Sequence, residues 1–475
     1  MTFRRFALSR RKTLGLFAGV AAAPLLPPLA TAASQPRRLT PAPGRVQLVG
    51  RDYPATAVWA YDGQVPGPLL RYRQGDNLDL ELINGLPQAT TVHWHGLRLP
   101  NDMDGVPGIT QAAVLPGERF RYRFPLKDAG TFWYHPHANS AEQVGRGLSG
   151  VLIVDEAEPP QVDREELWVL DDWRLDEEAQ VVPGFRDSLH DAAHAGRIGN
   201  TVTLNGFLPA TWPVHRGERV RLRLVNVANA RTFGLRFEGH KPQIVALDGQ
   251  PCVPHSPPSD LVTLPAGGRC DLILDLDRTP GSRFRLVDAH YQRFAYKLLD
   301  IVYGEGPPLR DGPLDTPISL AANPLPVADL RDAEDLQVVL GGGAMGRMMS
   351  ARLGGERLGA RQLAARGKVW ALNGLAHGAH DDPPLFVLTR GRTYRLRLIN
   401  ETRFEHPMHL HGHHLQLLAR DGRAVEPQTW HDTLLVAPGE TVDTVFVAET
   451  PGRWMFHCHV LEHQQAGMMA TVVVD

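Results

Sequence analysis

The sequence has 475 residues, which is too long for one ordinary hydrophobic core and predicts about three domains. Its 50 basic and 52 acidic side chains nearly cancel and are interspersed, so the charge gives no reason to bind nucleic acid or an anionic membrane. Glycine (46) and proline (39) are abundant, which indicates short strands joined by turns, and the 21 histidines are the unusual feature of the composition.

The chain begins with a segment typical of an export signal. Basic residues, including Arg10-Arg11, precede an apolar stretch from Leu14 to Leu29 and small residues around Ala30. This pattern resembles the twin-arginine type, so we expect residues 1–33 to be cleaved and the mature protein to be periplasmic or secreted. The apolar stretch is short and interrupted by prolines, and we expect no membrane anchor after cleavage.

A glycine, a run of alternating charged and apolar residues, and an asparagine occur together three times, at 75–84, 217–226 and 391–400. Such alternation predicts a strand with one face buried and the other in water. Each copy is followed further along the chain by a second strand signature. A turn that begins with proline and contains glycine comes directly before that strand, at 116–118, 265–268 and 438–440. Two strand signatures repeated three times in the same order predict an all-β fold of three related β-sandwich domains.

Proline-rich stretches near 158–160 and 307–326 are the natural connectors between these domains. We therefore place the domains at 40–157, 160–305 and 325–475. The third domain carries an insertion after Leu340 that is rich in glycine, arginine and methionine, and its composition predicts a mobile loop with room for one helix.

Three cysteines are too few for a disulfide scaffold. Cys252 and Cys270 form a disulfide in an oxidising compartment or remain buried thiols, and the sequence leaves both open. Cys458 is the odd one and lies inside a histidine cluster.

Ten of the histidines fall in four clusters, two in the first domain and two in the third. The clusters are His93-Trp94-His95, His135-Pro136-His137, the stretch from His406 to His411, and the stretch from His457 to His463, with Met468 beyond it. In an extended segment the HxH spacing sends both imidazoles to one face, where they bind different metal ions or share one. A single HxH is more often a solvated strand face, but four clusters with a cysteine among them indicate metal binding.

One part of this pattern is more specific. A thiolate with two imidazoles and a distant thioether is typical of an electron-transfer copper site. Cys458, His463 and Met468 supply three members of that set, and His406 is the natural fourth.

These four clusters resemble the copper signatures of the multicopper oxidases, the family of laccases, ascorbate oxidases and bacterial cuprous oxidases. The stretch HCHVLEHQQAGMM, from His457 to Met469, is most similar to the bacterial copper-efflux type. The resemblance covers the whole mature chain. It implies three cupredoxin-like Greek-key β-sandwich domains, four copper ions, and the reduction of O2 to water by four one-electron oxidations of a small reducing substrate.

The resemblance also implies a role for each clustered residue. The type 1 copper ligands would be His406, Cys458, His463 and Met468. The type 2 copper would be held by His93 and His409, one type 3 copper by His95, His135 and His459, and the other by His137, His411 and His457. Because Cys458 lies between His457 and His459, an electron would have a route through bonds to both type 3 coppers. The second domain supplies no ligand and is expected to be a structural spacer.

Two further positions concern protons. Asp104 matches the position where relatives place a carboxylate near the type 2 copper to relay protons to reduced oxygen, so we take it as a candidate catalytic residue. An ordinary turn aspartate before Gly105 is the alternative. Gln464 stands where relatives have a second carboxylate, which removes a proton-accepting group from that route.

The reducing substrate has two interpretations. A metal ion, Cu(I) or else Mn(II) or Fe(II), is favoured by export, by Met468 and by the overall similarity. Met345, Met348 and Met349 have the i, i+3, i+4 spacing of one helical face and would offer soft sulfur ligands to Cu(I), or else fill the core. Oxidation of phenols or aromatic amines, as in laccases, is favoured by the short methionine segment, which should leave the type 1 edge open.

A third interpretation comes from a different class of protein, a copper-storing or cell-division scaffold. The complete ligand set disfavours it. We expect a monomer, and the remaining histidines, His190 and His194 among them, are expected to be surface or structural residues.

Overall fold

The computed structural model describes residues 36–185, 188–312, 314–316, 318–346, 348–377 and 382–475. The expected export signal at 1–33 lies outside the described residues. Within the described ranges, none of the helices has the length and apolar character needed to cross a bilayer.

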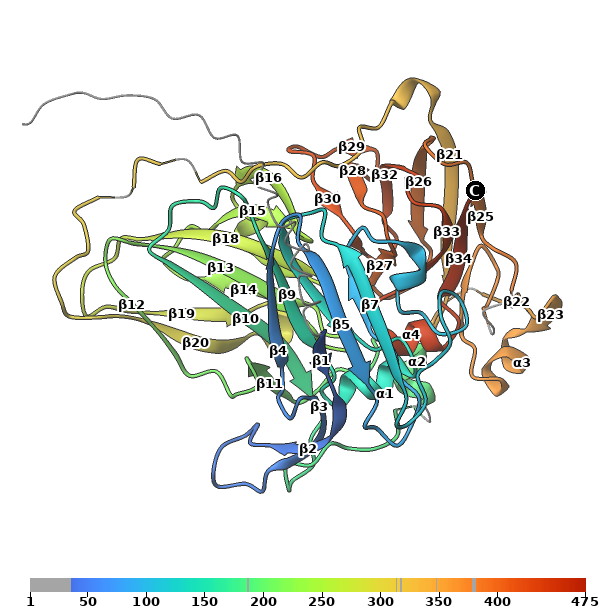
Figure 1. Cartoon of the computed structure of the whole chain (residues 1–475), viewed down its shortest axis with the longest axis horizontal. Coiled ribbons are helices and arrows are strands. Elements are labelled where there is room, and N and C mark those ends of the chain that lie inside the picture. The colour runs from blue at the N-terminus through green and yellow to red at the C-terminus, as the bar shows by residue number, and fades with distance from the viewer. Residues whose placement is uncertain (1–35, 186–187, 313, 317, 347, 378–381) are drawn as a thin grey trace, which may run out of the picture. The chain divides into compact units, whose positions relative to one another are not determined.

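The strands fall into three groups that follow one another along the chain (Figure 1). The first group comprises β1 (Arg37–Leu39), β2 (Pro41–Val46), β3 (Thr56–Tyr61), β4 (Gly67–Arg73), β5 (Asn77–Ile83), β6 (His93–His95), β7 (Arg119–Pro125), β8 (Gly130–His135) and β9 (Gly150–Asp155), with helix α1 (Ser140–Gly145). The second comprises β10 (Arg164–Trp173), β11 (Thr201–Leu204), β12 (Thr211–Val214), β13 (Glu218–Asn226), β14 (Phe233–Phe237), β15 (Gln243–Leu247), β16 (Gln250–His255), β17 (Val262–Leu264), β18 (Arg269–Leu276), β19 (Arg283–Asp288) and β20 (Tyr296–Tyr303), with α2 (Leu189–Ala193).

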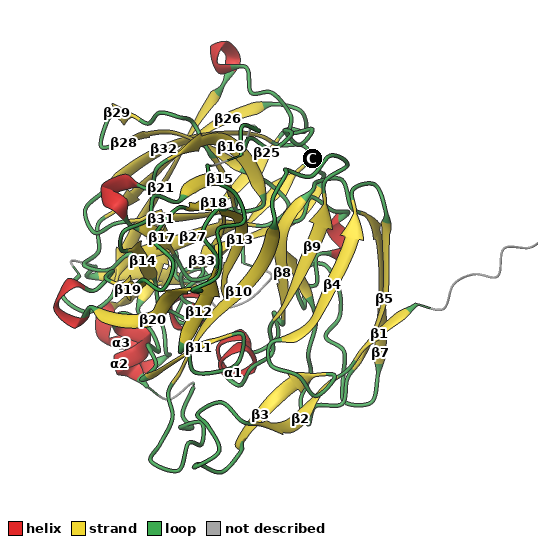
Figure 2. Cartoon of the chain, turned by 90° about the vertical axis from the view of Figure 1, so that its left-hand side faces the viewer, coloured by secondary structure: helices red, strands yellow, loops and turns green. Residues whose placement is uncertain are grey.

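The third group holds the longest series of strands. It comprises β21 (Glu334–Gly342), β22 (Ser350–Leu353), β23 (Glu356–Gly359), β24 (Trp370–Leu372), β25 (Phe386–Leu388), β26 (Thr393–Asn400), β27 (His406–Leu410), β28 (Leu415–Arg420), β29 (Arg423–Ala424), β30 (Trp430–His431), β31 (Thr433–Val436), β32 (Thr441–Val447), β33 (Gly452–Cys458) and β34 (Met469–Val474), with α3 (Ala360–Ala365) and α4 (Leu461–Gln465). Strands dominate the chain and its helices are short (Figure 2).

Each group repeats the same arrangement of two sheets. In one sheet, the strand of the repeated glycine motif lies between a parallel and an antiparallel neighbour, in the orders β1-β5-β7, β10-β13-β18 and β21-β26-β32. In the other sheet, a parallel pair continues into antiparallel strands, in the orders β4-β9-β8-β6, β12-β20-β19-β14-β17 and β25-β34-β33-β27-β31. The predicted all-β fold of three related β-sandwiches is therefore confirmed.

The hydrophobic cores explain which groups meet at the histidines. One continuous apolar cluster contains residues of both the first and the third group, for example Trp94, Leu410 and Phe456. The second group has an apolar cluster of its own, which includes Leu222, Leu272 and Ile301. The first and third groups thus share a core, and the second packs against them.

The strands of the repeated motif differ in how they use their polar face. In β5 and β26, apolar and exposed or half-exposed side chains alternate, as predicted. In β13 every residue is buried, so the expectation that its charged face lies in water was wrong. The reason is that this face packs against β8 of the first group, and Val225 shares one apolar cluster with Trp133 of β8 and Val151 of β9.

The buried arginines of β13 are neutralised by carboxylates from two groups. Arg221 contacts Glu156 at 2.6 Å and Asp271 at 2.7 Å, and Arg223 contacts Asp271 at 3.1 Å. Thr131 donates a further hydrogen bond to Asp271 at 2.7 Å. Burial alone would raise the pKa of Asp271, but Arg223 and Arg221 outweigh it and hold that pKa below its ordinary value. An ionic cluster therefore joins the first group to the second.

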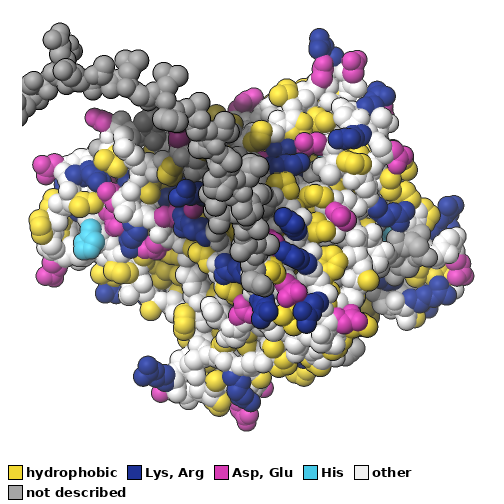
Figure 3. Space-filling model, in the orientation of Figure 1, with side chains coloured by type: hydrophobic (Ala, Val, Ile, Leu, Met, Phe, Trp, Pro, Cys, Tyr) yellow, Lys and Arg dark blue, Asp and Glu magenta, His cyan; other side chains and the backbone are white. Residues whose placement is uncertain are grey.

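All three cysteines are free thiols. Burial raises the pKa of Cys252 to about 12 and raises that of Cys270 well above its ordinary value. On the face shown in Figure 3, basic and acidic side chains are interspersed.

The ionic cluster makes Asp271 a sensitive position. The substitution Asp271→Asn leaves two buried guanidinium groups short of negative charge, and we expect it to lower the free energy of unfolding by about 3 kcal/mol or more. Because the pKa of Asp271 is lowered on folding, its contribution is present at neutral pH and is lost as the pH falls below about 4. Urea unfolding measures the effect.

The matched control is Asp79→Asn, since Asp79 pairs with Arg121 at the surface at 2.7 Å. It should leave the urea midpoint nearly unchanged. Equal midpoints for the two variants would show that the buried cluster adds nothing.

Candidate metal centre

Sheet register brings the histidine clusters together in pairs. In the first group, His93 of β6 lies opposite His135 of β8. In the third group, His409 of β27 lies opposite His457 of β33, and Met408 lies opposite Cys458. The shared core then sets the two pairs of strands against each other.

Eight buried histidines form one cluster between the first and third groups. They are His93, His95, His135, His137, His409, His411, His457 and His459. The Nε2 atoms of His93 and His409 are 3.4 Å apart, those of His411 and His457 are 3.1 Å apart, and the rings of His95 and His409 stack at 3.8 Å. Side-chain donor atoms within 4.8 Å of one another occur in four overlapping triplets: 93/95/409, 93/137/411, 95/135/459 and 409/411/457.

The outer nitrogen of several rings is already hydrogen-bonded. Nδ1 of His93 and Nδ1 of His409 each lie 2.8 Å from a backbone oxygen, that of Asp104 and that of Asp432 respectively. Nδ1 of His411 donates to the Asp104 carboxylate at 2.8 Å. This fixes the proton on the outer nitrogen and leaves the inner Nε2 atom with a lone pair.

The inner nitrogens have no comparable partners. Within the described residues, Nε2 of His135, Nδ1 of His95 and both ring nitrogens of His137 and His459 are buried without a hydrogen bond. Burial, together with neighbouring imidazoles, holds the pKa of each of these four rings well below its ordinary value. Neutral imidazoles with converging lone pairs are the arrangement that copper ions require, so the residues fit a multinuclear copper site.

A second donor set lies beside this cluster. Sγ of Cys458 is 3.5 Å from Nδ1 of His406 and 3.7 Å from Nδ1 of His463, and the two Nδ1 atoms are 3.2 Å apart. Met468 is buried. Its backbone oxygen accepts a hydrogen bond from the Cys458 N–H, and its N–H donates to the His463 backbone oxygen. Burial raises the pKa of the Cys458 thiol and lowers that of His463 to about 3, so a bound metal ion would be needed to ionise the thiol.

The edge of this second set is covered. His463 has no solvent exposure, its Nε2 donates to the backbone oxygen of His194 at 2.6 Å, and the ring of Trp370 lies 4.4 Å away. His194 follows α2, which packs on α4. The expectation that a short methionine segment leaves this edge open was wrong, because a segment of the second group lies over it.

The methionine segment does not form the predicted helix. Met345 has a φ of 59°, and only seven residues separate the end of β21 from the start of β22, so the chain turns there instead. Met348 packs into a small apolar cluster, whereas Met345 and Met349 are 73% and 81% exposed. The helix predicted for the insertion is α3, which lies further along.

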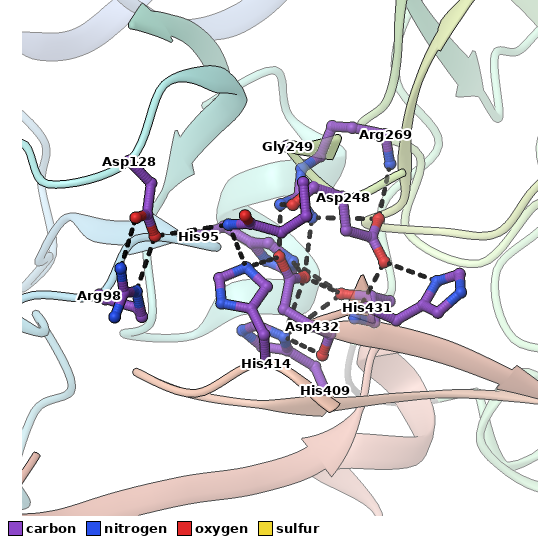
Figure 4. A network of polar contacts seen from close by, with 12 residues as sticks. His95, Arg98, Asp128, Asp248, Gly249, Arg269, His409, His414, His431 and Asp432 are labelled. Carbon is purple, nitrogen blue, oxygen red and sulfur yellow. Dashed lines mark hydrogen bonds and ion pairs between the residues drawn. The ribbon is translucent and has the colours of Figure 1, made fainter. Parts of the chain in front are cut away.

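Asp432 is a central residue that the sequence interpretation missed (Figure 4). Its carboxylate lies 3.0 Å from Nε2 of His95 and receives two hydrogen bonds from Arg269, one of them at 2.8 Å. Arg269 belongs to the second group and also contacts Asp248. The second group therefore orients a ring of the histidine cluster and is more than a spacer.

Close packing supports the same conclusion. Gly267 has a φ of 82°, and a Cβ atom there would lie 2.8 Å from the ring of His459. This glycine belongs to the proline and glycine turn at 265–268 that precedes Arg269. The repeat was visible in the sequence, but its contact with the third group depends on how the sandwiches pack.

A cavity of about 520 Å³ lies on the outer side of this network. Its walls are mainly apolar side chains of the second and third groups, and Asp248, Arg269 and Thr433 are among its polar residues. Thr433 Oγ1 is 2.8 Å from Nε2 of His95, so the cavity ends one residue from the histidine cluster.

Asp104 contacts two rings of the cluster. One carboxylate oxygen lies 2.8 Å from Nδ1 of His411 and the other 3.3 Å from Nδ1 of His93. Gly105 has a φ of 81°, and a Cβ atom there would collide with the backbone of Val92. Asp104 is thus a turn residue whose side chain lies at the cluster.

Comparison with known proteins agrees with this geometry. Three family models, each described as multicopper oxidase, match residues 45–159, 165–293 and 358–475. The chain is 30% identical to the multicopper oxidase MmcO of Mycobacterium tuberculosis, over 90% of this chain and 85% of that protein. It is 26% identical to a copper resistance protein A homolog of Pseudomonas syringae, over 89% and 90%. The crystal structure of a multicopper oxidase from Pseudomonas thermotolerans superposes with a TM-score of 0.80 and 34% identity, covering 93% of this chain and 99% of that one.

The chain therefore belongs to the multicopper oxidase family, as the sequence predicted. Members of the family are copper-dependent oxidoreductases that carry one type 1, one type 2 and two type 3 copper ions and use O2 as electron acceptor.

The role of Asp432 can be tested by Asp432→Asn. This change weakens the hold on His95 and removes the closer of the two carboxylates that contact Arg269, and we expect copper affinity to fall about tenfold or more. The copper content per chain after dialysis against a chelator, together with the electron paramagnetic resonance of type 2 copper, measures the loss. The control Asp443→Asn removes a surface partner of Arg397 and should keep the full copper content. Equal copper content in both variants would rule out the orienting role.

Proposed function

We propose that the copper ligands are those implied by the family resemblance, within domains at 40–157, 160–305 and 325–475. Type 1 copper is assigned to His406, Cys458, His463 and Met468, type 2 copper to His93 and His409, and the type 3 pair to His95, His135 and His459 and to His137, His411 and His457. The assignment is supported by the donor triplet 406/458/463, by the triplet 95/135/459 and by the free inner nitrogens of the cluster.

Copper supplies the one-electron chemistry and the binding of O2. The chain supplies the connection: Cys458 is covalently flanked by His457 and His459, whose rings belong to the eight-histidine cluster. A substrate electron accepted at the Cys458 set thus has a short covalent route to the place where O2 is reduced. The cavity that ends at Thr433 is the route we assign to O2 and water.

For the substrate we propose a metal ion, with Cu(I) favoured. The observation that carries this choice is the complete burial of His463 beneath His194 and Trp370. A phenol ring cannot contact that imidazole, whereas a metal ion held at the surface can pass its electron through the covering segment. The copper resistance protein A homolog among the relatives supports the same choice.

We further propose that the protein is exported by its N-terminal segment and acts as a periplasmic or secreted monomer, without nucleic acid or membrane as partners. The basic and apolar pattern of residues 1–33 supports export.

The first test is oxygen uptake by the copper-loaded mature protein. We expect rapid uptake with Cu(I), and oxidation of dimethoxyphenol when Cu(II) is added to mediate electron transfer. Phenol turnover that does not depend on added Cu(II) would make the protein a laccase. Absence of uptake with Cu(I) would contradict the proposal and direct attention to Mn(II) and Fe(II).

We propose two roles for Asp104 that an experiment can separate. It holds His93 and His411 in place, and it passes protons. Asp104→Asn keeps the size and a hydrogen-bond acceptor but cannot take up a proton at neutral pH. We expect four copper ions per chain to be retained and kcat to fall about 100-fold. A variant with full copper content and unchanged kcat would leave Asp104 with the holding role alone.

A further inference from the structure

Three hydrogen bonds fasten the end of α2 to the third group, and one of them comes from His463 of the Cys458 donor set. The last carbonyl groups of a helix lack partners within the helix. Here the Ala192 oxygen accepts from Trp370 Nε1 at 2.6 Å, the Ala193 oxygen from the Ala344 backbone at 2.7 Å, and the His194 oxygen from His463 Nε2 at 2.6 Å. All three donors belong to the third group, so the end of α2 is fixed at the buried His463, and α2 lies beside α4 (Figure 1).

Two imidazoles lie at this end of the segment, His190 inside α2 and His194 directly after it. His190 and His194 are one helical turn apart, and their rings stack at 4.2 Å with an interplanar angle of 13°. The side chain of His190 is 79% exposed and His194 is partly exposed. Nδ1 of His194 donates to the His190 backbone oxygen at 3.0 Å, which leaves Nε2 of His194 with a free lone pair.

The backbone also brings a methionine to the end of α2. Because the Ala344 N–H binds the Ala193 oxygen, the following residue, Met345, is placed beside α2. Met345 is 73% exposed. The nearest carboxylate in sequence, Asp191, is engaged by Arg174 at 2.7 and 3.0 Å, so the exposed donors here are imidazole nitrogens and sulfur.

We propose that His190, His194 and Met345 form the docking site of the substrate Cu(I) ion. Two histidines at i and i+4 with adjacent rings are a recurrent metal-binding arrangement, and adding a thioether favours a soft monovalent copper ion over Mn(II) or Fe(II). This inference rests on the proposed function and names its substrate site.

The same residues define the route of the electron. A Cu(I) ion bound at His194 gives up one electron, which passes through the covalent bonds of His194 to its carbonyl oxygen. From there the electron crosses one hydrogen bond to His463. The ion leaves as Cu(II). Four such oxidations and four protons reduce one O2 to two molecules of water, with O2 supplied by the established activity of the family.

The experiment uses the copper-loaded enzyme and the double variant H190A/H194A. Ag(I), a redox-inert ion of the same charge and softness, is titrated calorimetrically to measure binding. Cu(I), supplied as its acetonitrile complex, is used to measure KM and kcat by oxygen uptake. Both substitutions keep the backbone carbonyl groups, so the blue absorption of the Cys458 site should be unchanged.

We expect the double variant to bind Ag(I) at least about tenfold more weakly and to raise KM for Cu(I) by a similar factor. Met345→Leu should shift both quantities in the same direction by a smaller factor. His215→Ala, which removes an exposed histidine at the end of β12, is the matched control and should behave as wild type.

Wild-type Ag(I) affinity and wild-type KM in H190A/H194A would overturn the docking site while leaving the proposed function intact. If the wild-type enzyme does not oxidise Cu(I), the proposed function fails instead. The Ag(I) titration then decides alone whether the two histidines and Met345 bind a soft metal ion.

Discussion

The structure depends on one constraint: uncharged imidazoles can be buried against one another only if their lone pairs are shared with cations. Eight rings lie together with donor nitrogens as close as 3.1 Å, and several of those nitrogens have no other partner in the described residues. Protonating them would place like charges side by side in an apolar interior, which their lowered pKa values reflect. Copper ions satisfy the lone pairs without adding protons, so metal binding and the packing of the first group against the third are coupled.

The rest of the molecule holds the outer side of these rings. Asp104 from the first group and Asp432 from the third each contact two histidines, and Arg269 from the second group neutralises Asp432. A buried carboxylate is costly without such a partner. This explains why a sandwich that supplies no candidate ligand is still required: it provides the positive charge that allows Asp432 to sit at the cluster.

The sequence predicted what depends on local pattern and repetition. Alternation along 75–84 and 391–400 identified β5 and β26, and the HxH spacings identified strands whose histidines share a face. It failed where burial comes from another part of the chain. The arginines of β13 have the alternation of a solvated face, yet they are covered by β8 and neutralised by Glu156 and Asp271. In the same way, His194 gives no local sign that its carbonyl group covers His463.

The two sides of the copper region differ in a way that suits their tasks. The cavity ends at Thr433, which contacts His95, and its mainly apolar walls suit the small neutral molecule, O2, whose route we propose there. His463 is instead fully buried and is covered by the His194 backbone carbonyl and the ring of Trp370. In the proposed function, a reductant therefore meets a surface through which electrons pass but which it cannot enter. The ligands that hold it at that surface select it, rather than the shape of a pocket. Under the proposed ligand assignment, keeping reductant and O2 apart also means that electrons reach O2 only along the covalent path through Cys458, which favours delivery of all four before a partly reduced product can escape.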